Sequence, residues 1–191
     1  MSRRSTNWTF LVWCDSTPNW RNIIEEYHVA WCESPVHEYD TNEDGSQKKC
    51  HRHIALTFDS LKSFDQVKEI TDQIGTTIPM PVQSMKGLIQ YFTHKNNPEK
   101  YQYNEKDIIP HGGFDLQEYL KPTQTEYEEL AKSLDQFIID NGITEFNELV
   151  LAVVNMDEDR WLYILRNRNT AFYKTWLQNR SYNRRQSNEK Q

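Results

Sequence analysis

Residues 50–58 alternate between two kinds of side chain, and this segment sets the framework for the rest of the chain. Alternate residues of a β-strand point to opposite faces of the sheet. One face of the segment is apolar and directed at a core, with Ile54, Leu56 and Phe58. The opposite face is less apolar and carries His51 and His53, so two imidazoles stand side by side on it. The segment therefore predicts a strand with a core on one face and a site on the other.

Further possible metal ligands precede this strand. The apolar run 28–32 predicts a strand, after which Pro35 interrupts strand pairing and begins a loop. His37 and Asp40 lie in that loop and can lean back over the neighbouring strand. Imidazole and carboxylate ligands together suit Mn²⁺ or Mg²⁺ in a catalytic site. Two alternatives stay open: ordinary turn and surface residues, or a structural zinc site in which Cys50 joins the three histidines.

A tyrosine borders the core on a helix predicted to begin after Ser84, which is a suitable N-cap. Apolar residues recur at helical spacing and form a core-facing stripe of Met85, Leu88, Ile89 and Phe92. Tyr91 lies about 110° from the centre of this stripe, at about 100° per residue. Its phenol could attack a metal-held phosphodiester, and Lys95 on the same flank could hold a phosphate. The alternative is a tyrosine that packs at the rim of the core.

Three motifs, in this order and spacing, resemble the endonuclease domain of plasmid rolling-circle replication initiators. The likeness is to the single-tyrosine Rep proteins of the His-x-His (HUH) superfamily. The motifs are Ser34-Pro35-x-His37-x-x-Asp40, His51-x-His53 and Tyr91-x-Thr93-His94. The resemblance covers residues 7–120 well and residues 123–180 in outline. Arg52 is a departure, because an apolar residue usually stands between the two histidines in this superfamily.

The resemblance implies a specific chemistry. One Mn²⁺ or Mg²⁺ ion would be held by His37, Asp40, His51 and His53. Tyr91 would nick one strand of the origin, giving a 5′-phosphotyrosyl link and a free 3′-OH primer, and a second transfer would rejoin the strand at termination. A non-catalytic origin-binding or copy-control protein with the same fold is the alternative function.

The partners implied by the resemblance are those of a plasmid replication initiator in the bacterial cytoplasm. The chain would bind plasmid origin DNA, both as a duplex and as a single-stranded hairpin. Host DNA polymerase and helicase would act with it. A homo-oligomer is also expected, which in known members of the family is a ring of six.

The net charge of −6 is unusual for a DNA-binding chain, but the charges are unevenly distributed. Residues 123–159 are strongly acidic, whereas the chain from residue 160 onward is basic. Local cations, rather than the total charge, decide phosphate binding. The predicted DNA-binding residues near the site are Lys48, Lys49, Lys86 and Lys95.

The fold class predicted for the chain is α+β. Residues 1–122 are expected to form an antiparallel sheet with helices on one face, as in ferredoxin-like (RRM-like) domains. Strands are expected over 8–14, 28–32, 50–58 and 76–83 and near Tyr101. Residues 123–180 predict a small all-helical oligomerisation domain of four helices, because so short a segment buries little core alone. Residues 181–191 are expected to be a disordered basic tail.

Two further expectations concern the cellular setting. Cys14, Cys32 and Cys50 are odd in number and lie on or beside predicted strands, which indicates reduced thiols in a cytosolic protein. No apolar run approaches the about twenty residues that a membrane-spanning helix needs. The N-terminus also lacks the apolar segment of a secretory signal. No membrane partner is expected.

Overall fold

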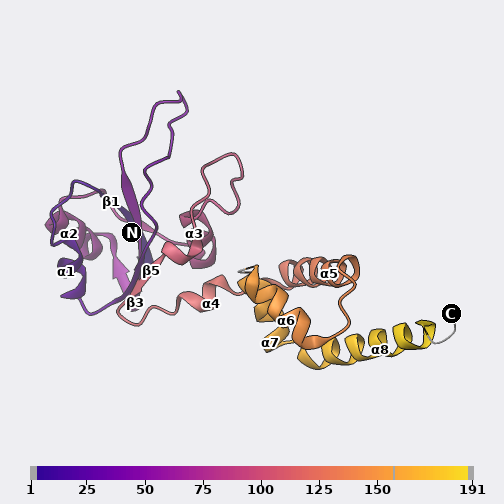
Figure 1. The fold of residues 1–191 in the computed structure, drawn as a ribbon. Coiled ribbons are helices and arrows are strands. Elements are labelled where there is room, and N and C mark those ends of the chain that lie inside the picture. The colour runs from indigo at the N-terminus through magenta and orange to yellow at the C-terminus, as the bar shows by residue number, and fades with distance from the viewer. Residues whose placement is uncertain (1–3, 157, 189–191) are drawn as a thin grey trace. The chain divides into compact units, whose positions relative to one another are not determined.

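The computed structural model describes residues 4–156 and 158–188. The chain divides at Lys121 and Pro122 into two compact units (Figure 1). The first unit contains a sheet with helices, and the second is helical. The fold class predicted from the sequence is thus confirmed.

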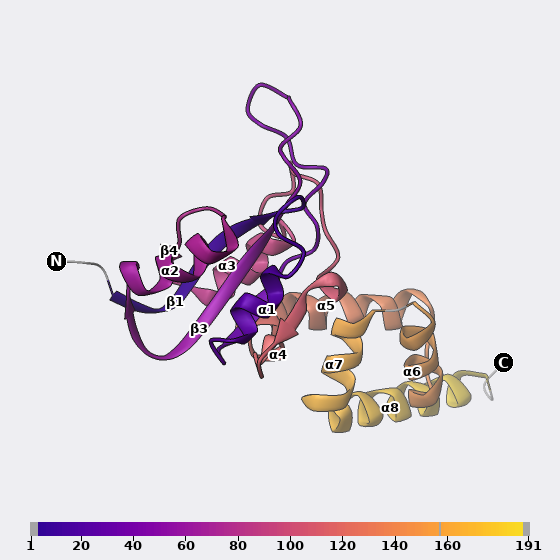
Figure 2. The same ribbon diagram turned by 90° about the vertical axis from the view of Figure 1, so that its left-hand side faces the viewer.

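The sheet has five strands in the order β4-β1-β3-β2-β5, and every neighbouring pair is antiparallel. The long strand β3 lies at the centre of the sheet and pairs with β1 (Figure 2). The strands are β1 (Arg4–Trp13), β2 (Ala30–Glu33), β3 (His51–Ser63), β4 (Met80–Pro81) and β5 (Ile109–His111).

Two predictions about the strands need correction. The strand expected over 76–83 is reduced to two edge residues by its prolines, and the last strand lies at β5 rather than near Tyr101.

The apolar face of β3 packs against β1 and two helices, as its alternation predicts. The register of β1 on β3 places Trp8 opposite Leu56 and Phe10 opposite Ile54. The helices α1 (Trp20–Glu25) and α2 (Phe64–Ile74) close this core. A reciprocal capping box between Ser63 and Gln66 begins α2. Gly75 ends it with φ of 72°, a left-handed conformation that glycine adopts without strain.

The opposite face of the sheet also carries helices, which the prediction of helices on one face did not include. The helices α3 (Met85–Phe92) and α4 (Leu116–Leu120) join a second core there. Ala55 and Cys32 supply the sheet side of this core. Their side chains are small, so the apolar stripe of α3 can pack beside the histidines of β3 rather than over them. A short 3₁₀ helix, η1 (Glu105–Asp107), precedes β5.

Two of the three cysteines form a disulfide, so the expectation of reduced thiols is wrong for this pair. Cys14 follows β1 and Cys50 precedes β3, and their Cα atoms lie 5.5 Å apart. The register that sets Trp13 opposite His51 brings the next residues of both strands together. The amide of Cys14 also donates to the carbonyl of Cys50 at 3.1 Å. Cys32 alone is free, and it is buried.

An ionic network surrounds the buried carboxylate of Glu33 on the face of β3 opposite the histidines. Arg21 donates two hydrogen bonds to Glu33, at 2.9 and 2.7 Å, and a ring nitrogen of His111 lies 3.0 Å from the same carboxylate. Arg52 lies 3.4 Å from Glu33 and donates to the carbonyl of Ser34 at 2.8 Å. Arg52 thus occupies the usually apolar position between the histidines because Glu33 neutralises it there.

This network makes stability sensitive to acid. Burial favours the neutral acid, but hydrogen bonds from Arg21 and His111 and the charge of Arg52 outweigh it and lower the pKa of Glu33. A lowered carboxyl pKa contributes stability above the ordinary glutamate value of 4.5, which is lost as the pH falls through the folded-state pKa. We expect Glu33→Gln to reduce the free energy of unfolding by about 3 kcal/mol at neutral pH. Urea unfolding at several pH values should show this difference shrink in acid; a difference independent of pH would contradict the assignment.

The second unit is built from four helices, α5 (Gln124–Asp140), α6 (Phe146–Asn155), α7 (Asp159–Asn167) and α8 (Thr170–Asn188). They enclose a core of their own, which includes Leu134, Ile138, Leu149, Val153, Ile164 and Tyr173. The tail expected to be disordered from residue 181 continues α8 as far as Asn188, and residues 189–191 lie outside the described residues. Within the described residues, no helix is both long and apolar enough to span a membrane.

Candidate metal centre and adjacent tyrosine

Backbone pairing brings His37 beside the histidine strand. Beyond the end of β2 the chain continues along β3, where the amide of His37 donates to the carbonyl of His51 at 2.8 Å. Ser34 anchors the intervening turn, because it donates its amide to the carbonyl of His53 and accepts the amide of His53 at its hydroxyl, both at 2.9 Å. The Pro35 segment is therefore held against the first residues of β3.

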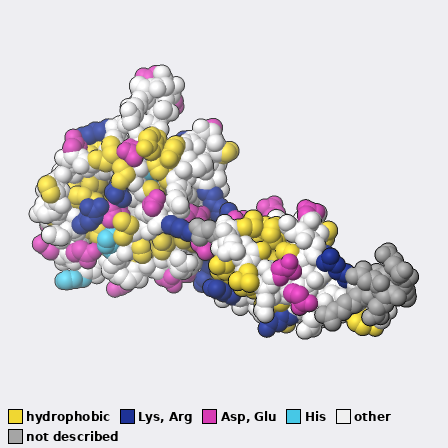
Figure 3. Space-filling view, viewed as in Figure 1, with side chains coloured by type: hydrophobic (Ala, Val, Ile, Leu, Met, Phe, Trp, Pro, Cys, Tyr) yellow, Lys and Arg dark blue, Asp and Glu magenta, His cyan; other side chains and the backbone are white. Residues whose placement is uncertain are grey.

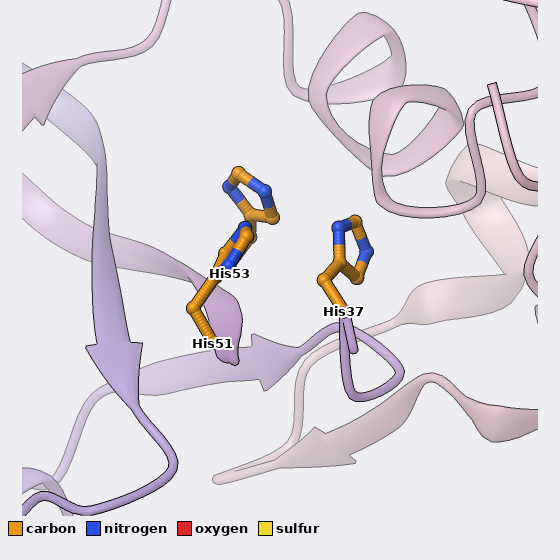
Figure 4. A group of neighbouring side chains, drawn as sticks. All are labelled: His37, His51 and His53. Atoms are coloured by element: carbon orange, nitrogen blue, oxygen red, sulfur yellow. The ribbon is translucent and has the colours of Figure 1, made fainter. Parts of the chain in front are cut away.

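Three imidazoles cluster at this point (Figure 4). His51 and His53 rise from β3 with ring centroids 5.1 Å apart, and His37 lies 5.2 and 4.8 Å from them. Asp40 joins the cluster through one carboxylate oxygen, Oδ2, which is 3.3 Å from His37 Nδ1 and 3.8 Å from His51 Nε2. The structure thus brings together all four side chains that the sequence predicts as metal ligands. Two sets of three side chains, His37 with His51 and His53, and His37 with Asp40 and His94, have donor atoms within 4.8 Å of one another.

Hydrogen bonds fix which nitrogen of each ring is available. Nε2 of His37 lies 2.8 Å from the carbonyl of Phe92, and Nδ1 of His51 lies 2.7 Å from the carbonyl of Lys49. A carbonyl only accepts, so these nitrogens carry the hydrogen and the other nitrogen of each neutral ring presents a lone pair to Asp40. Donation from the far nitrogen to a carbonyl is the usual arrangement of a metal-bound histidine.

One nitrogen of His53 gives independent support for a bound cation. Its Nε2 is buried and has no hydrogen-bond partner among the described residues. A buried polar atom without a partner is costly, and a metal ion would satisfy it. Imidazole nitrogens together with a carboxylate are ligands of divalent metal ions. The residues present therefore fit a divalent ion.

Electrostatics hold these groups in the forms that bind metals. Burial lowers the pKa of His37, and burial with repulsion from the neighbouring imidazoles lowers that of His53 well below its ordinary value. Burial alone would raise the pKa of Asp40, but the charge that His37 carries when protonated and a hydrogen bond from Tyr103 outweigh it, so this pKa is lowered. Neutral imidazoles and an ionised carboxylate are the ligand forms.

Tyr91 of α3 lies next to the cluster, with its ring centroid 5.2 Å from that of His53 in an edge-to-face arrangement. The ring is half-buried, as its position on the flank of the helix predicts. A cation does stand beside it, but this cation is Lys100, whose Nζ is 5.1 Å from the ring centroid. Nζ of Lys95 instead lies 3.9 Å from the carboxylate of Glu105.

The other lysines predicted to bind DNA occupy different places. Lys48 lies in the loop between β2 and β3, which extends from the sheet (Figure 2), and its charge contributes to lowering the pKa of His53. Lys49 pairs with Asp15 at 2.9 Å and lies over the ring of Trp13. Lys86 lies at the end of α3 that is remote from Tyr91, and it donates to the carbonyl of Lys121. On the face shown in Figure 3, basic side chains are scattered among acidic and apolar ones rather than gathered in one patch.

Two residues of the site have no predicted role from sequence. Tyr103 stacks on His37 with ring centroids 4.2 Å apart and donates its hydroxyl to Asp40 Oδ1 at 3.0 Å. His94 is fully buried with its Nε2 3.8 Å from Asp40 Oδ2. His94 belongs to the motif Tyr91-x-Thr93-His94 of the family resemblance, and this motif is the one sequence signal that points to it. The structural-zinc alternative loses its thiolate, because the sulfur of Cys50 is bonded to Cys14.

Comparison with known proteins places the chain in a family. Residues 1–117 match the family model described as plasmid replication protein, origin binding domain. The chain is 34% identical over 180 residues to a replication protein of Staphylococcus aureus, covering 94% of this chain and 90% of that protein. It is 36% identical over 179 residues to replication protein RepB of Lactiplantibacillus plantarum, covering 92% of this chain and 80% of that protein.

Proposed function

The chain belongs to the family of plasmid replication proteins with an origin-binding domain, and from this premise we propose that it cuts and rejoins one strand of origin DNA through Tyr91. One observation carries the proposal. A half-buried phenol lies beside a cluster of imidazoles and one carboxylate that is suited to a divalent ion. A protein that only binds the origin has no need of this arrangement.

The residues have defined parts in the proposed reaction. His37, Asp40, His51 and His53 would hold Mn²⁺ or Mg²⁺, and the bound ion would supply Lewis-acid stabilisation of the negative charge on the scissile phosphate. The phenol oxygen of Tyr91 attacks phosphorus as it loses its proton. The bond from phosphorus to the 3′ oxygen breaks, and that oxygen takes up a proton to become the 3′-OH primer. The new phosphotyrosyl ester conserves the phosphodiester, so a 3′-OH can reverse the step and rejoin the strand without ATP.

Basic side chains near the phenol are proposed to position the DNA. Lys100 lies over the ring of Tyr91 and is the lysine best placed to contact a phosphate next to the scissile bond. Lys48, Lys49, Lys86 and Lys95 would contact phosphates farther along the strand or duplex. Such contacts make affinity fall steeply with salt but carry no sequence information.

The helical unit is proposed to join copies of the chain. Several large apolar side chains of its helices are exposed although the unit has its own core: Ile139, Leu151, Val154, Met156 and Phe172. Self-association would remove this surface from water. A ring of six, as the resemblance implies, is one assembly that would place several nicking domains at one origin. Host polymerase and helicase would then use the 3′-OH and the opened duplex.

The proposal is tested by incubating the full chain with a labelled single-stranded origin oligonucleotide and Mn²⁺. We expect a labelled species that resists boiling in detergent and migrates as protein plus DNA. Chelation by EDTA should prevent its formation. Binding of the oligonucleotide without any covalent species, in the presence of Mn²⁺, would instead support a non-catalytic origin-binding or copy-control protein.

A further inference from the structure

His94 is a buried histidine whose Nε2 has no hydrogen-bond partner in the part of the chain that the structure describes. Its side chain is fully buried, and Nε2 makes no hydrogen bond among the described residues. Nδ1 lies 2.8 Å from the carbonyl of Tyr101. Because that carbonyl only accepts, Nδ1 carries the hydrogen, and in the neutral ring Nε2 presents a lone pair. His94 therefore shows the same arrangement as His37 and His51, in which one nitrogen donates to a backbone carbonyl and the other faces the cluster.

The lone pair of His94 is directed at the carboxylate of Asp40. Nε2 is 3.8 Å from Oδ2, which is too long for a hydrogen bond and leaves two electron-rich atoms facing each other. The donor atoms of His94, His37 and Asp40 all lie within 4.8 Å of one another. A second such group joins His37 to His51 and His53, so the two groups share one histidine. A cation bound between Nε2 of His94 and Oδ2 of Asp40 would remove the unfavourable contact between these two electron-rich atoms.

The backbone of His94 is held in an unusual conformation. Its φ is 58°, in the left-handed region, and among the described residues His28, at 49°, is the one other non-glycine residue with positive φ. Residues other than glycine adopt this region at a cost in free energy. Such a conformation persists where the surroundings or a function require it. The turn directs the imidazole inward just after α3 and keeps the amide of His94 bonded to the carbonyl of Tyr91 at 3.1 Å.

We propose that His94 is a further ligand of the divalent ion at this centre. The inference rests on the proposed function for the presence of the ion, and it deepens that function by assigning a ligand from the turn that carries the nucleophile. Tyr91 and His94 are three residues apart, and their ring centroids lie 5.4 Å apart. A bond from His94 to the ion therefore ties the end of α3 to the sheet and fixes the phenol relative to the ligands of β3.

The test compares His94→Asn with His28→Asn in the full chain. Asparagine tolerates the left-handed region, so the first variant removes the imidazole with little change in backbone preference. The second makes the same change at a left-handed histidine outside the cluster. Mn²⁺ binding is measured without DNA, by calorimetry and by electron paramagnetic resonance of the free ion. We expect His94→Asn to weaken binding by about tenfold or more and His28→Asn to leave it unchanged.

Further variants distinguish a failure of the His94 assignment from a failure of the proposed function. His51→Ala reports on the proposed centre itself and should weaken Mn²⁺ binding strongly. If His51→Ala loses the ion while His94→Asn binds it as tightly as the unaltered chain, His94 is not a ligand and the proposed function stands. If the unaltered chain binds no Mn²⁺, both proposals fail. Should His94→Asn not fold by circular dichroism, His94→Gly replaces it, because glycine adopts this conformation freely, and unchanged affinity in that variant also overturns the assignment.

Discussion

Tyr91→Phe is expected to abolish covalent attachment to origin DNA, with a loss on the order of a thousandfold or more, because the attacking oxygen is removed. Origin binding should persist with unchanged affinity. Phenylalanine keeps the ring that packs on His53 and lies under Lys100, so the surroundings need not rearrange. Adduct formation is measured on denaturing gels, and binding by fluorescence anisotropy of the same oligonucleotide.

Tyr101→Phe is the matched control for this change. Tyr101 is half exposed and lies near the site, with its ring 4.6 Å from that of Tyr39 and 4.8 Å from that of Tyr103. We expect it to form the adduct at the rate of the unaltered chain. An adduct that survives in Tyr91→Phe and disappears in Tyr101→Phe would move the nucleophile to the second tyrosine and overturn the assignment.

His53→Leu is expected to change metal binding and stability in opposite directions. Loss of a ligand should weaken Mn²⁺ binding by on the order of a hundredfold and reduce adduct formation accordingly. The metal-free chain should hold or gain stability, by about 1 kcal/mol, because leucine removes a buried nitrogen that has no partner among the described residues. Calorimetric titration and urea unfolding with EDTA measure the two effects.

Thr57→Val offers a control on the same face of β3. The hydroxyl of Thr57 is also buried without a partner among the described residues, but no group of candidate ligands includes it. We expect a comparable gain in stability with Mn²⁺ affinity unchanged. If His53→Leu bound Mn²⁺ as tightly as Thr57→Val does, His53 would not be a ligand, and the account of the centre would be wrong.

Local periodicity was sufficient to predict much of this architecture. Alternation in 50–58 identified β3 and the face that carries His51 and His53. The spacing of apolar residues identified α3, with Tyr91 on its flank rather than in its stripe. The same reasoning identified the four helices of the second unit. Each of these features depends on neighbours in sequence, which is why a single sequence reveals them.

Other features depend on pairings between distant segments or on single backbone angles. The disulfide requires the register of β1 on β3, which no local pattern specifies. The inward turn of His94 depends on one left-handed residue after α3, whereas helical periodicity gives no reason to direct it toward Asp40. Placement of α3 on the histidine face follows from the small side chains of Cys32 and Ala55, whose importance emerges only when the strands are aligned.

Covalent joining of Tyr91 to DNA beside a metal centre of histidines and Asp40 is tested most directly by mass spectrometry. The adduct is formed with a labelled origin oligonucleotide and Mn²⁺ and digested with protease, and the nucleotide is located in the peptides. We predict a single modified peptide with a 5′-phosphate ester on Tyr91. Modification of another residue, or an adduct that forms equally well in EDTA, would contradict this prediction.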